Sequence, residues 1–496
     1  MADYLHGAYG TIEVGGVTGA EIGANAMVYV GTAPAHQVGA GAAPANKPVL
    51  VRSFNEAKAL FGYSPDWEHF TLCEAMYAHF VMRSIGPVIF INVFNPAAGE
   101  LGQQQTVTAT PVNGVVKVKL TAECAIDSVA VTGKDASAYT KEFDGMTDTL
   151  ILRETSSGAL GTTQLTITYK KADLTDIDGD LIIGSDADAS TGTNGTGLYA
   201  LKSVYQQTKF VPAYLVVPGF SSDKAVHDVM CEVSQKVNSH WDMYLFTDLP
   251  VVDVNNDDAP IMPAGAAAWK AANGYDKPFE TVCYPMIEVS GGRKMHMSVM
   301  RAMNMQQLLN EESGIPYRSA SNTDAPEIVK LSYAEGVDFQ MDETMVNEYL
   351  NKHGIASAAY VAGRWAMWGA HAANYEFGES DRGTFETDMM MLYYVSNDFQ
   401  MRRAGDVDKP MSMNDIRSIM SEEQARLSSL ISIGALIYGV VEQDNELMAF
   451  SDVINGDFKF SFKVTTTPLA KSLTALVGWT DEGFVSYYAD FVGNNA

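Results

Sequence analysis

Between residue 99 and about residue 190 the sequence loses all sign of helical periodicity. Five short segments rich in Thr and Val occupy this interval, with Gly, Asp and Ser between them: TVTATPV, VVKVKLT, DSVAVTG, DTLILRE and QLTITYK. Short, regularly spaced strands separated by turn residues are typical of a β-sandwich. Alternating strand and helix patterns lie on both sides, so we expect a β-sandwich domain (residues 99–195) inserted into an α/β protein.

The flanking segments predict a mostly parallel α/β sheet. Apolar runs such as AMVYVGTAP, GPVIFINVFNP, FVPAYLVVPGF, WDMYLFTDLP and TVCYPMIEV have the length of buried strands. Helical patterns follow at about 71–84, 222–237, 295–309 and 342–352. We therefore expect a first α/β domain at 21–98 and a second at 196–375, before a C-terminal domain at 376–496.

Both ends of the chain have the pattern of extended arms. Residues 1–20 are Gly-rich, and near the C-terminus FKFSFKV and the later segments that contain Trp479 and Phe484 alternate as half-buried strands do. An uncovered strand edge invites pairing with another chain. We expect strand addition between copies of this protein through two sets of residues, Tyr9, Ile12 and Val14 in the N-terminal arm and Phe484, Val485, Tyr487 and Tyr488 in the closing strand.

Charge and composition restrict the class of protein. The 496 residues include 33 Lys or Arg and 60 Asp or Glu, a formal net charge of −27, which argues against direct nucleic-acid binding. The start MADYLHGAYG has no signal-peptide pattern, and the apolar stretch Leu430–Val441 is too short to cross a bilayer. The four scattered cysteines are expected to be reduced core thiols, so we expect cytoplasmic synthesis.

The sequence offers little catalytic chemistry. HExxH, GxSxG, GxxxxGK and GxGxxG are all absent, and His227 and His371 have the pattern of core histidines. The acidic stretch from Asp173 to Asp188 is dense enough to bind Ca²⁺, but EF-hand spacing fails there, and a solvated acidic turn is the favoured interpretation. We expect no catalytic residues, no metal and no cofactor.

Motifs spread over nearly the whole chain resemble those of contractile-tail sheath proteins, from contractile phage tails and related phage-tail-like particles. They are YVGTAP with PVLVRSFNEAKALFG, GPVIFINV, VVPGF with FTDLP, GIPYRSASN, GIASAAYVAGRWAMWGAHAAN and FKFSFKVTTTPLAKSLTALV. The resemblance implies a subtilisin-like fold for the second α/β domain, without its chemistry. It also implies rings of subunits stacked around an inner tail tube, terminal arms that connect neighbours, and contraction triggered by a baseplate. The implied partners are other copies of the chain, the tube protein, and baseplate and tail terminator proteins, and the implied location is the virion tail sheath after synthesis in the host cytoplasm.

In that family a helix of the C-terminal domain lies against the tube. The strong late helical pattern here is Met413–Ile431, with Ser412 as N-cap. Its expected surface charges, the hypothetical tube contacts, are Asp415, Arg417, Glu422, Glu423 and Arg426. An ordinary amphipathic helix with a solvated face explains the same pattern equally well.

Two other classes remain open. One is an α/β enzyme, a hydrolase or sugar-acting enzyme with an appended sandwich, which would need paired carboxylates in a cleft. The other is a surface or adhesion protein, which suits the sandwich but lacks an export signal. In the sheath interpretation, the sandwich faces away from the tail axis and is dispensable, since insertions usually occupy outer surfaces.

Overall fold

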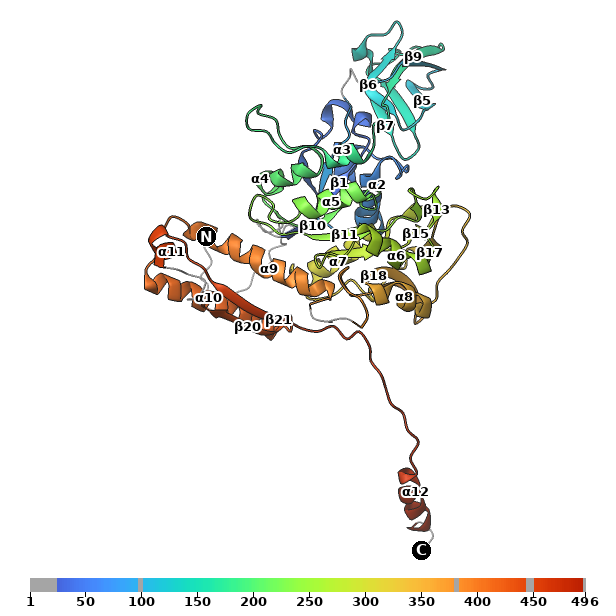
Figure 1. Ribbon diagram of the computed structural model, residues 1–496. Coiled ribbons are helices and arrows are strands. Elements are labelled where there is room, and N and C mark those ends of the chain that lie inside the picture. The colour runs from blue at the N-terminus through green and yellow to red at the C-terminus, as the bar shows by residue number, and fades with distance from the viewer. Residues whose placement is uncertain (1–24, 97–100, 379–382, 443–449, 494–496) are drawn as a thin grey trace, which may run out of the picture.

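The computed structural model describes residues 25–96, 101–378, 383–442 and 450–493 (Figure 1). Its centre is an eight-stranded sheet in the order β19-β18-β14-β11-β10-β1-β3-β2. The strands are β1 Asn25–Gly31, β2 Pro48–Val51, β3 Val88–Asn92, β10 Val211–Val216, β11 Tyr244–Asp248, β14 Glu280–Cys283, β18 Ile355–Val361 and β19 Arg364–Trp368. The six inner strands pair in parallel, and the edge strands β2 and β19 are antiparallel. The mostly parallel sheet predicted from the sequence is confirmed.

Helices cover both faces of this sheet, which explains its apolar strands. In β1, Met27 and Tyr29 join one core, with α7 (Met297–Glu311) and α2 (Thr71–Met76). Val28 and Val30 join a second core, with α5 (Lys224–Val233). Strands from residues 25–92 and 211–368 share the sheet, so it extends across the two α/β segments that the sequence suggested. We call this sheet and its covering elements, residues 25–96 and 172–378, the body.

The inserted sandwich consists of two three-stranded sheets, β4-β9-β6 and β5-β8-β7, around a small core of its own. Its strands are β4 Gln104–Ala109, β5 Val115–Lys119, β6 Cys124–Val131, β7 Tyr139–Asp144, β8 Thr149–Glu154 and β9 Leu165–Lys171. The chain enters and leaves at one place, because the Gly102 amide donates to the Lys171 carbonyl at 2.8 Å. After β9 the chain returns to the body, where α3 (Gly179–Ile183) packs on α5.

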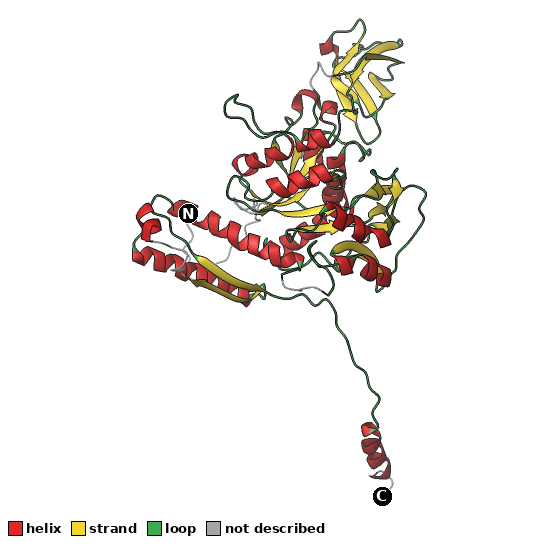
Figure 2. Cartoon of the chain, viewed as in Figure 1, coloured by secondary structure: helices red, strands yellow, loops and turns green. Residues whose placement is uncertain are grey.

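The C-terminal part is a separate layer beside the body (Figure 2). The long helices α9 (Glu386–Arg403) and α10 (Met413–Ser432) pack with the antiparallel strands β20 (Leu436–Glu442) and β21 (Ser461–Thr466). A small core of their own includes Met391, Leu427, Leu430, Leu436 and Val441. We call the described part of residues 383–467 the C-terminal module. Residues 468–493, the C-terminal tail, extend away from it and end in α12 (Glu482–Gly493).

The remaining elements complete the body and its loops. Two small sheets, β12-β13 and β16-β15-β17, lie outside the main sheet. The other elements are β12 Val252–Asp253, β13 Ala259–Pro260, β15 Met286–Val289, β16 Arg293–Met295, β17 Ile328–Ser332, α1 Phe54–Phe61, the π-helical η3 Tyr77–Met82, α4 Val204–Thr208, α6 Pro263–Asn273, α8 Glu343–Tyr349, α11 Phe450–Asn455 and the short 3-10 turns η1 Ala35–Gln37, η2 Gly39–Gly41, η4 Ala136–Ala138, η5 Gly197–Ser203, η6 Asn351–His353 and η7 Ala404–Asp406. Within the part of the chain that the structure describes, none of the helices combines the length and apolar character needed to cross a bilayer.

Candidate functional site

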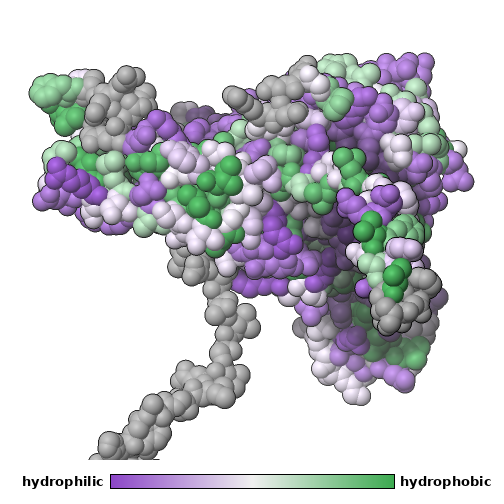
Figure 3. Space-filling view, turned by 90° about the horizontal axis from the view of Figure 1, so that it is seen from below, coloured by the Kyte–Doolittle hydropathy of each residue, from purple (hydrophilic) through white to green (hydrophobic). Residues whose placement is uncertain are grey.

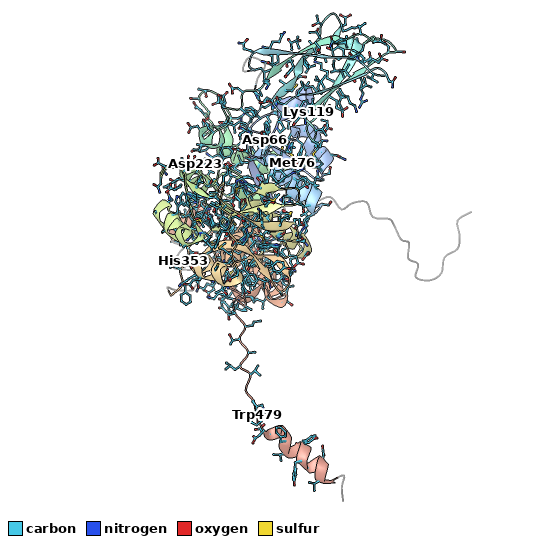
Figure 4. All side chains as sticks on the ribbon, turned by 90° about the vertical axis from the view of Figure 1, so that its right-hand side faces the viewer. Asp66, Met76, Lys119, Asp223, His353 and Trp479 are labelled. Carbon is cyan, nitrogen blue, oxygen red and sulfur yellow. The ribbon has the colours of Figure 1, made fainter. Side chains whose placement is uncertain are left out.

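The C-terminal tail is the most unusual surface of the molecule. Leu476 is 96% exposed and Trp479 is 82% exposed, and Trp479 lies on the tail well away from the body (Figure 4). The other exposed apolar residues of the tail are Leu473, Val477, Phe484, Val485, Tyr487, Tyr488 and Val492. Monomeric proteins rarely display so many large apolar side chains together, and such surfaces mark interaction sites.

The strand predicted around Phe484–Tyr488 is wrong, because these residues belong to α12. Apolar side chains at 484, 485, 487, 488 and 492 fit a helical period as well as an alternating one. Helix start signals decide the outcome: the Thr480 hydroxyl accepts from the Glu482 amide at 3.2 Å, and Glu482 lies in the first turn. The segment that contains Leu473, Val477 and Trp479 has no regular secondary structure, so the alternation there did not produce a strand either. The N-terminal arm residues Tyr9, Ile12 and Val14 lie outside the described residues.

The tail leaves the molecule beside a groove of about 1200 Å³. The groove lies between the segment Tyr317–Thr323, α8 and the loop around Tyr375, and the first tail residues, up to Leu473, line one side of it. Lys471 donates to the Tyr375 hydroxyl at 3.1 Å and lies 5.2 Å from the centre of that ring. Lys471 therefore ties the start of the tail to the body, although its side chain and the tail residues that follow it are exposed.

The two-stranded sheet of the module has one edge suited to pairing with a further strand. The Gln424 side chain donates to the Gly439 carbonyl and accepts from the Val441 amide, both at 3.0 Å, so α10 occupies backbone groups of β20. Among the described residues, β21 has β20 as its only strand partner. A strand edge without a neighbour is a template for strand addition.

Exposed apolar side chains also occur on the module itself. Ile433, Ile437 and Tyr438 are half-exposed around the start of β20. Seen from below, hydrophobic areas lie among hydrophilic ones over the left part of the surface, where the module lies (Figure 3). The module therefore combines an open strand edge with nearby apolar surface.

The predicted charged residues of α10 divide into two groups. Asp415 and Arg417 are exposed, and Asp415 forms a capping box with Ser412. Glu422 is 57% exposed and pairs with Arg403 at 2.8 Å. Arg426, half-buried, pairs with Asp398 of α9 at 3.1 Å and binds the Tyr394 hydroxyl.

The expectation that Glu423 is a surface charge is wrong. Its side chain is 0% exposed and is paired with Arg403 at 2.5 Å and with Arg402 at 2.8 Å, both from α9. The reason is that α9 packs along α10, and the sequence pattern of α10 alone could not show which polar face α9 covers. Glu423 and Arg426 hold the two helices together, which leaves Asp415, Arg417 and Glu422 as the accessible charges of the predicted set.

The body contains a buried polar cluster with Asp, His and Ser, but the three do not form a catalytic triad. His296 Nδ1 is 2.8 Å from Glu74 Oε2, and the Ser298 hydroxyl donates to Asp248 Oδ2 at 2.5 Å rather than to a histidine. Burial alone would lower the pKa of His296, but the Glu74 carboxylate and the charge of Asp248 raise it to about 9. A protonated histidine without a serine partner cannot act as the general base of acyl transfer.

A second buried group, His227, Cys231 and Glu280, resembles a nucleophile pair at first sight, because Cys231 Sγ lies 3.6 Å from His227 Nε2. The same nitrogen, however, lies 2.8 Å from Glu280 Oε2. Burial raises the pKa of the Cys231 thiol to about 12, and the charge of Glu280 adds to this. Since the thiolate is the nucleophile, this geometry does not activate Cys231.

In the acidic stretch Asp173–Asp188, several carboxylates bind hydrogen-bond donors or a lysine nearby in the chain. Asp173 accepts from Thr175, Asp178 caps α3, and Asp186 pairs with Lys202 at 2.6 Å. Within the described residues, the His227 group is the one set of three potential metal-ligating side chains whose ligand atoms converge. The sequence analysis missed this group, because Glu280 is far along the chain from the helix that carries the other two residues. The available signal was the spacing of His227 and Cys231, four residues apart on one helix.

No family model matches the sequence, and no curated protein matches it. Solved structures similar to this chain include the helical sheath of the anti-feeding prophage in the contracted state, at 13% identity and a TM-score of 0.49, covering 97% of this chain and 100% of that one. A sheath tail protein from Desulfitobacterium hafniense is 9% identical with a TM-score of 0.48, covering 88% of this chain and 94% of its own. A sheath tail protein from Listeria innocua is 12% identical with a TM-score of 0.46, covering 91% and 96%. With TM-scores below 0.5 in all three, the function assigned to this chain has to come from its own sequence and geometry.

Proposed function

We propose that this chain is the structural subunit of a contractile tail sheath, which polymerises around an inner tail tube and contracts to drive the tube through a host envelope. The observation that carries the proposal is the C-terminal tail, a long apolar segment that its own subunit leaves exposed. The sequence motifs that resemble those of sheath proteins are the reason for proposing this family. The resemblance implies that the domain at 196–375 has a subtilisin-like fold with a structural role and no protease chemistry.

The tail has the reach needed to bind a neighbouring subunit. About 10 residues separate Lys471, which contacts the body, from α12, and an extended chain spans roughly 3.3 Å per residue, so α12 can dock roughly 33 Å from Lys471. Burying large side chains such as Trp479 or Phe484 contributes roughly 1.5–3 kcal/mol each, which offsets the cost of ordering the segment. The outer edge of β21 on another copy, with the apolar surface around Ile437, is the acceptor that we propose.

The N-terminal arm (Tyr9, Ile12, Val14) has the corresponding role on a second neighbour in this proposal. Contacts made by both arms are head-to-tail, and such contacts generate rings or helical tubes rather than closed dimers. Baseplate and tail terminator proteins would bind the ends of the stack. The β-sandwich, inserted at a single point on the far side of the body from the module, suits an outer position.

Tube contact remains a proposal for the exposed face of α10. Asp415, Arg417 and Glu422 are accessible there, and charge pairs at a rim give register more than affinity. Glu423 and Arg426 are not expected to contact the tube directly, because they pair with α9.

The enzyme alternative has less support. His296 is paired with Glu74 and Ser298 with Asp248, and the thiol of Cys231 has a raised pKa. A structural subunit requires none of these groups to be accessible. The large groove beside the tail is open on the surface, and the chain's own tail residues line it.

Electron microscopy of the purified full-length protein, with sedimentation across a concentration series, tests the proposal. We expect tubes or cogwheel-shaped rings of uniform diameter that grow with concentration. Monomers of constant sedimentation coefficient at every concentration would contradict a sheath role, as would irregular aggregates without a repeating subunit.

A further inference from the structure

His227, Cys231 and Glu280 converge from two elements of the body. His227 and Cys231 are one turn apart on the same face of α5, and Glu280 is the first residue of β14. The His nitrogen, the Cys sulfur and a carboxylate oxygen all lie within 4.8 Å of one another. From this geometry we infer a zinc-binding site formed by these three side chains, independent of the sheath function proposed above.

The donor set matches zinc in type and size. Zn²⁺ is bound in proteins by His nitrogen, Cys sulfur and carboxylate oxygen at about 2.0–2.3 Å. Ligand atoms of a tetrahedral site are therefore about 3.3–3.8 Å apart. His227 Nε2 and Cys231 Sγ are already 3.6 Å apart, and the 2.8 Å between Nε2 and Glu280 Oε2 needs to open by about 0.5 Å to admit the ion.

Charge favours occupation of the site. A zinc ion with one thiolate, one carboxylate and one neutral imidazole carries no net charge. His227 and Glu280 are fully buried, and an uncompensated carboxylate in such a place is costly. Zinc binding displaces the proton of the Cys231 thiol and needs the imidazole N–H on Nδ1 rather than on Nε2, so binding releases a proton.

The surroundings hold the ligands in place. The His227 ring stacks on Tyr275 with centroids 3.7 Å apart, and the Tyr275 hydroxyl is anchored to the Ser221 carbonyl at 3.0 Å. The second carboxylate oxygen of Glu280 accepts from the Lys277 amide at 3.0 Å. A fixed imidazole and a fixed carboxylate reduce the cost of ordering the ligands.

One further feature of His227 fits a metal ligand. Its Nδ1 is buried and has no hydrogen-bond partner among the described residues, and the exposed side chain of Asp228 lies 3.9 Å away. In zinc sites the distal imidazole N–H is usually paired with a carboxylate. A rotation of the exposed Asp228 side chain supplies that partner, and the partial exposure of Cys231 provides an entry path for the ion and room for a water as fourth ligand.

Cobalt binding to the full-length protein tests the site, because Co²⁺ is a coloured probe for zinc sites. We expect one equivalent of Co²⁺ to produce a thiolate-to-metal charge-transfer band, which one equivalent of Zn²⁺ then removes. Cys231→Ser should lose the band, whereas Cys124→Ser, a matched change of a buried cysteine in the sandwich, should keep it. Zn²⁺ should also raise the Tm of the wild-type protein by several degrees and that of Cys231→Ser by much less.

Two results would overturn the inference. One is a wild-type protein that neither shows the charge-transfer band nor changes its Tm with an excess of Zn²⁺. The other is a Cys231→Ser variant with unchanged secondary structure that retains the band at full intensity, which would place the ion elsewhere.

Discussion

The body and the C-terminal tail differ in how far their apolar side chains are buried and their charged side chains are paired within the subunit. Where α9 meets the body, Arg301 and Glu386 are both 0% exposed, and Glu386 also accepts from Thr281, Ser319 and the Ala320 amide. In the tail, the apolar side chains described on α12 point into solvent. A region whose polar groups are paired and whose apolar groups are buried is stable alone, whereas the tail needs a second surface.

The module lies between these extremes. Its ion pairs link α9 to α10, its core is small, and one strand edge is unoccupied among the described residues. The helix α9 belongs to both regions: Glu386 pairs with the body, and seventeen positions later Arg403 pairs with Glu423 of α10.

The largest loss of stability is expected from breaking the buried ion pair between the body and α9. Glu386→Gln leaves the Arg301 guanidinium buried without its counter-charge, which costs about 3–5 kcal/mol of unfolding free energy. Arg364→Gln is the matched control, because Arg364 and Asp324 form an exposed pair worth less than about 1 kcal/mol. Denaturant unfolding measures both, and equal effects would show that the body does not depend on its buried charges.

A smaller and local loss is expected in the module. Glu423→Gln removes the partner of Arg402 and Arg403 and should destabilise the α9–α10 contact by about 2 kcal/mol, less than in the body because both arginines are partly exposed. Hydrogen exchange should accelerate about 30-fold in α10 and β20 and hardly at all in the main sheet. Glu422→Gln, one residue earlier and exposed, should leave exchange nearly unchanged, and exchange that accelerates equally in the main sheet would remove the distinction between module and body.

His296, a partly exposed histidine of the body, predicts a loss of stability at alkaline pH. The folded-state pKa of His296 is about 9, above the ordinary value of 6.5, so its contribution is complete below pH 6.5 and is lost as the pH rises through 9. Burial also raises the pKa values of Glu74 and Asp248, so their proton-linked contribution is lost as the pH rises above their ordinary values. We expect on the order of 1–3 kcal/mol between pH 6.5 and 9.5. The measurement is Tm against pH, and His296→Gln should flatten the curve in this window; an identical slope in the variant would assign the effect to another group.

Excision of the sandwich should have the smallest effect on the body. Since the Gly102 amide and the Lys171 carbonyl are hydrogen-bonded, residues 103–170 can be replaced by a two-glycine linker. The Tm of the body should fall by only a few degrees, because its side-chain hydrogen bonds to the sandwich are few, such as those from His36 and Gln37 to the Ala122 carbonyl. A longer deletion that joins Pro96 to Gly197 removes α3 with its buried Ile182 and should be much more damaging. Equal damage from the two deletions would show that the sandwich, not α3, is structural.

Elements with a regular pattern of buried residues were predicted correctly from the sequence. Prediction failed for an element that packs against two different parts of the molecule. The parallel strands and the sandwich were predicted because burial on both faces, or on one, leaves a clear pattern. The helix α9 was missed: Met389, Met390 and Met391 are followed by Tyr393 and Tyr394, so it faces the body and the module with different sides and has no single apolar stripe. TVCYPMIEV was interpreted as one strand, but Pro285 separates β14 from β15, which belongs to a different sheet.

The candidate sites show the same limit. Glu422 and Glu423 are neighbours of equal charge in the sequence, and only the position of α9 makes one exposed and the other buried. The convergence of Glu280 on His227 and Cys231 depends on the packing of α5 against the sheet. Contacts between elements distant in the chain have no local sequence signal, whereas the tail was signalled by its own closely spaced apolar residues.

The most direct test of the central claim is a chain that ends at Lys471, compared with the full-length protein. The shortened chain keeps the contact between Lys471 and Tyr375, and the residues that it loses are exposed wherever the structure describes their side chains. The account predicts an unchanged Tm, within about 1 °C, together with loss of rings and tubes in electron microscopy and sedimentation as a monomer. A shortened chain that still forms tubes of normal diameter, or one that unfolds, would contradict the claim that the tail serves assembly and not folding.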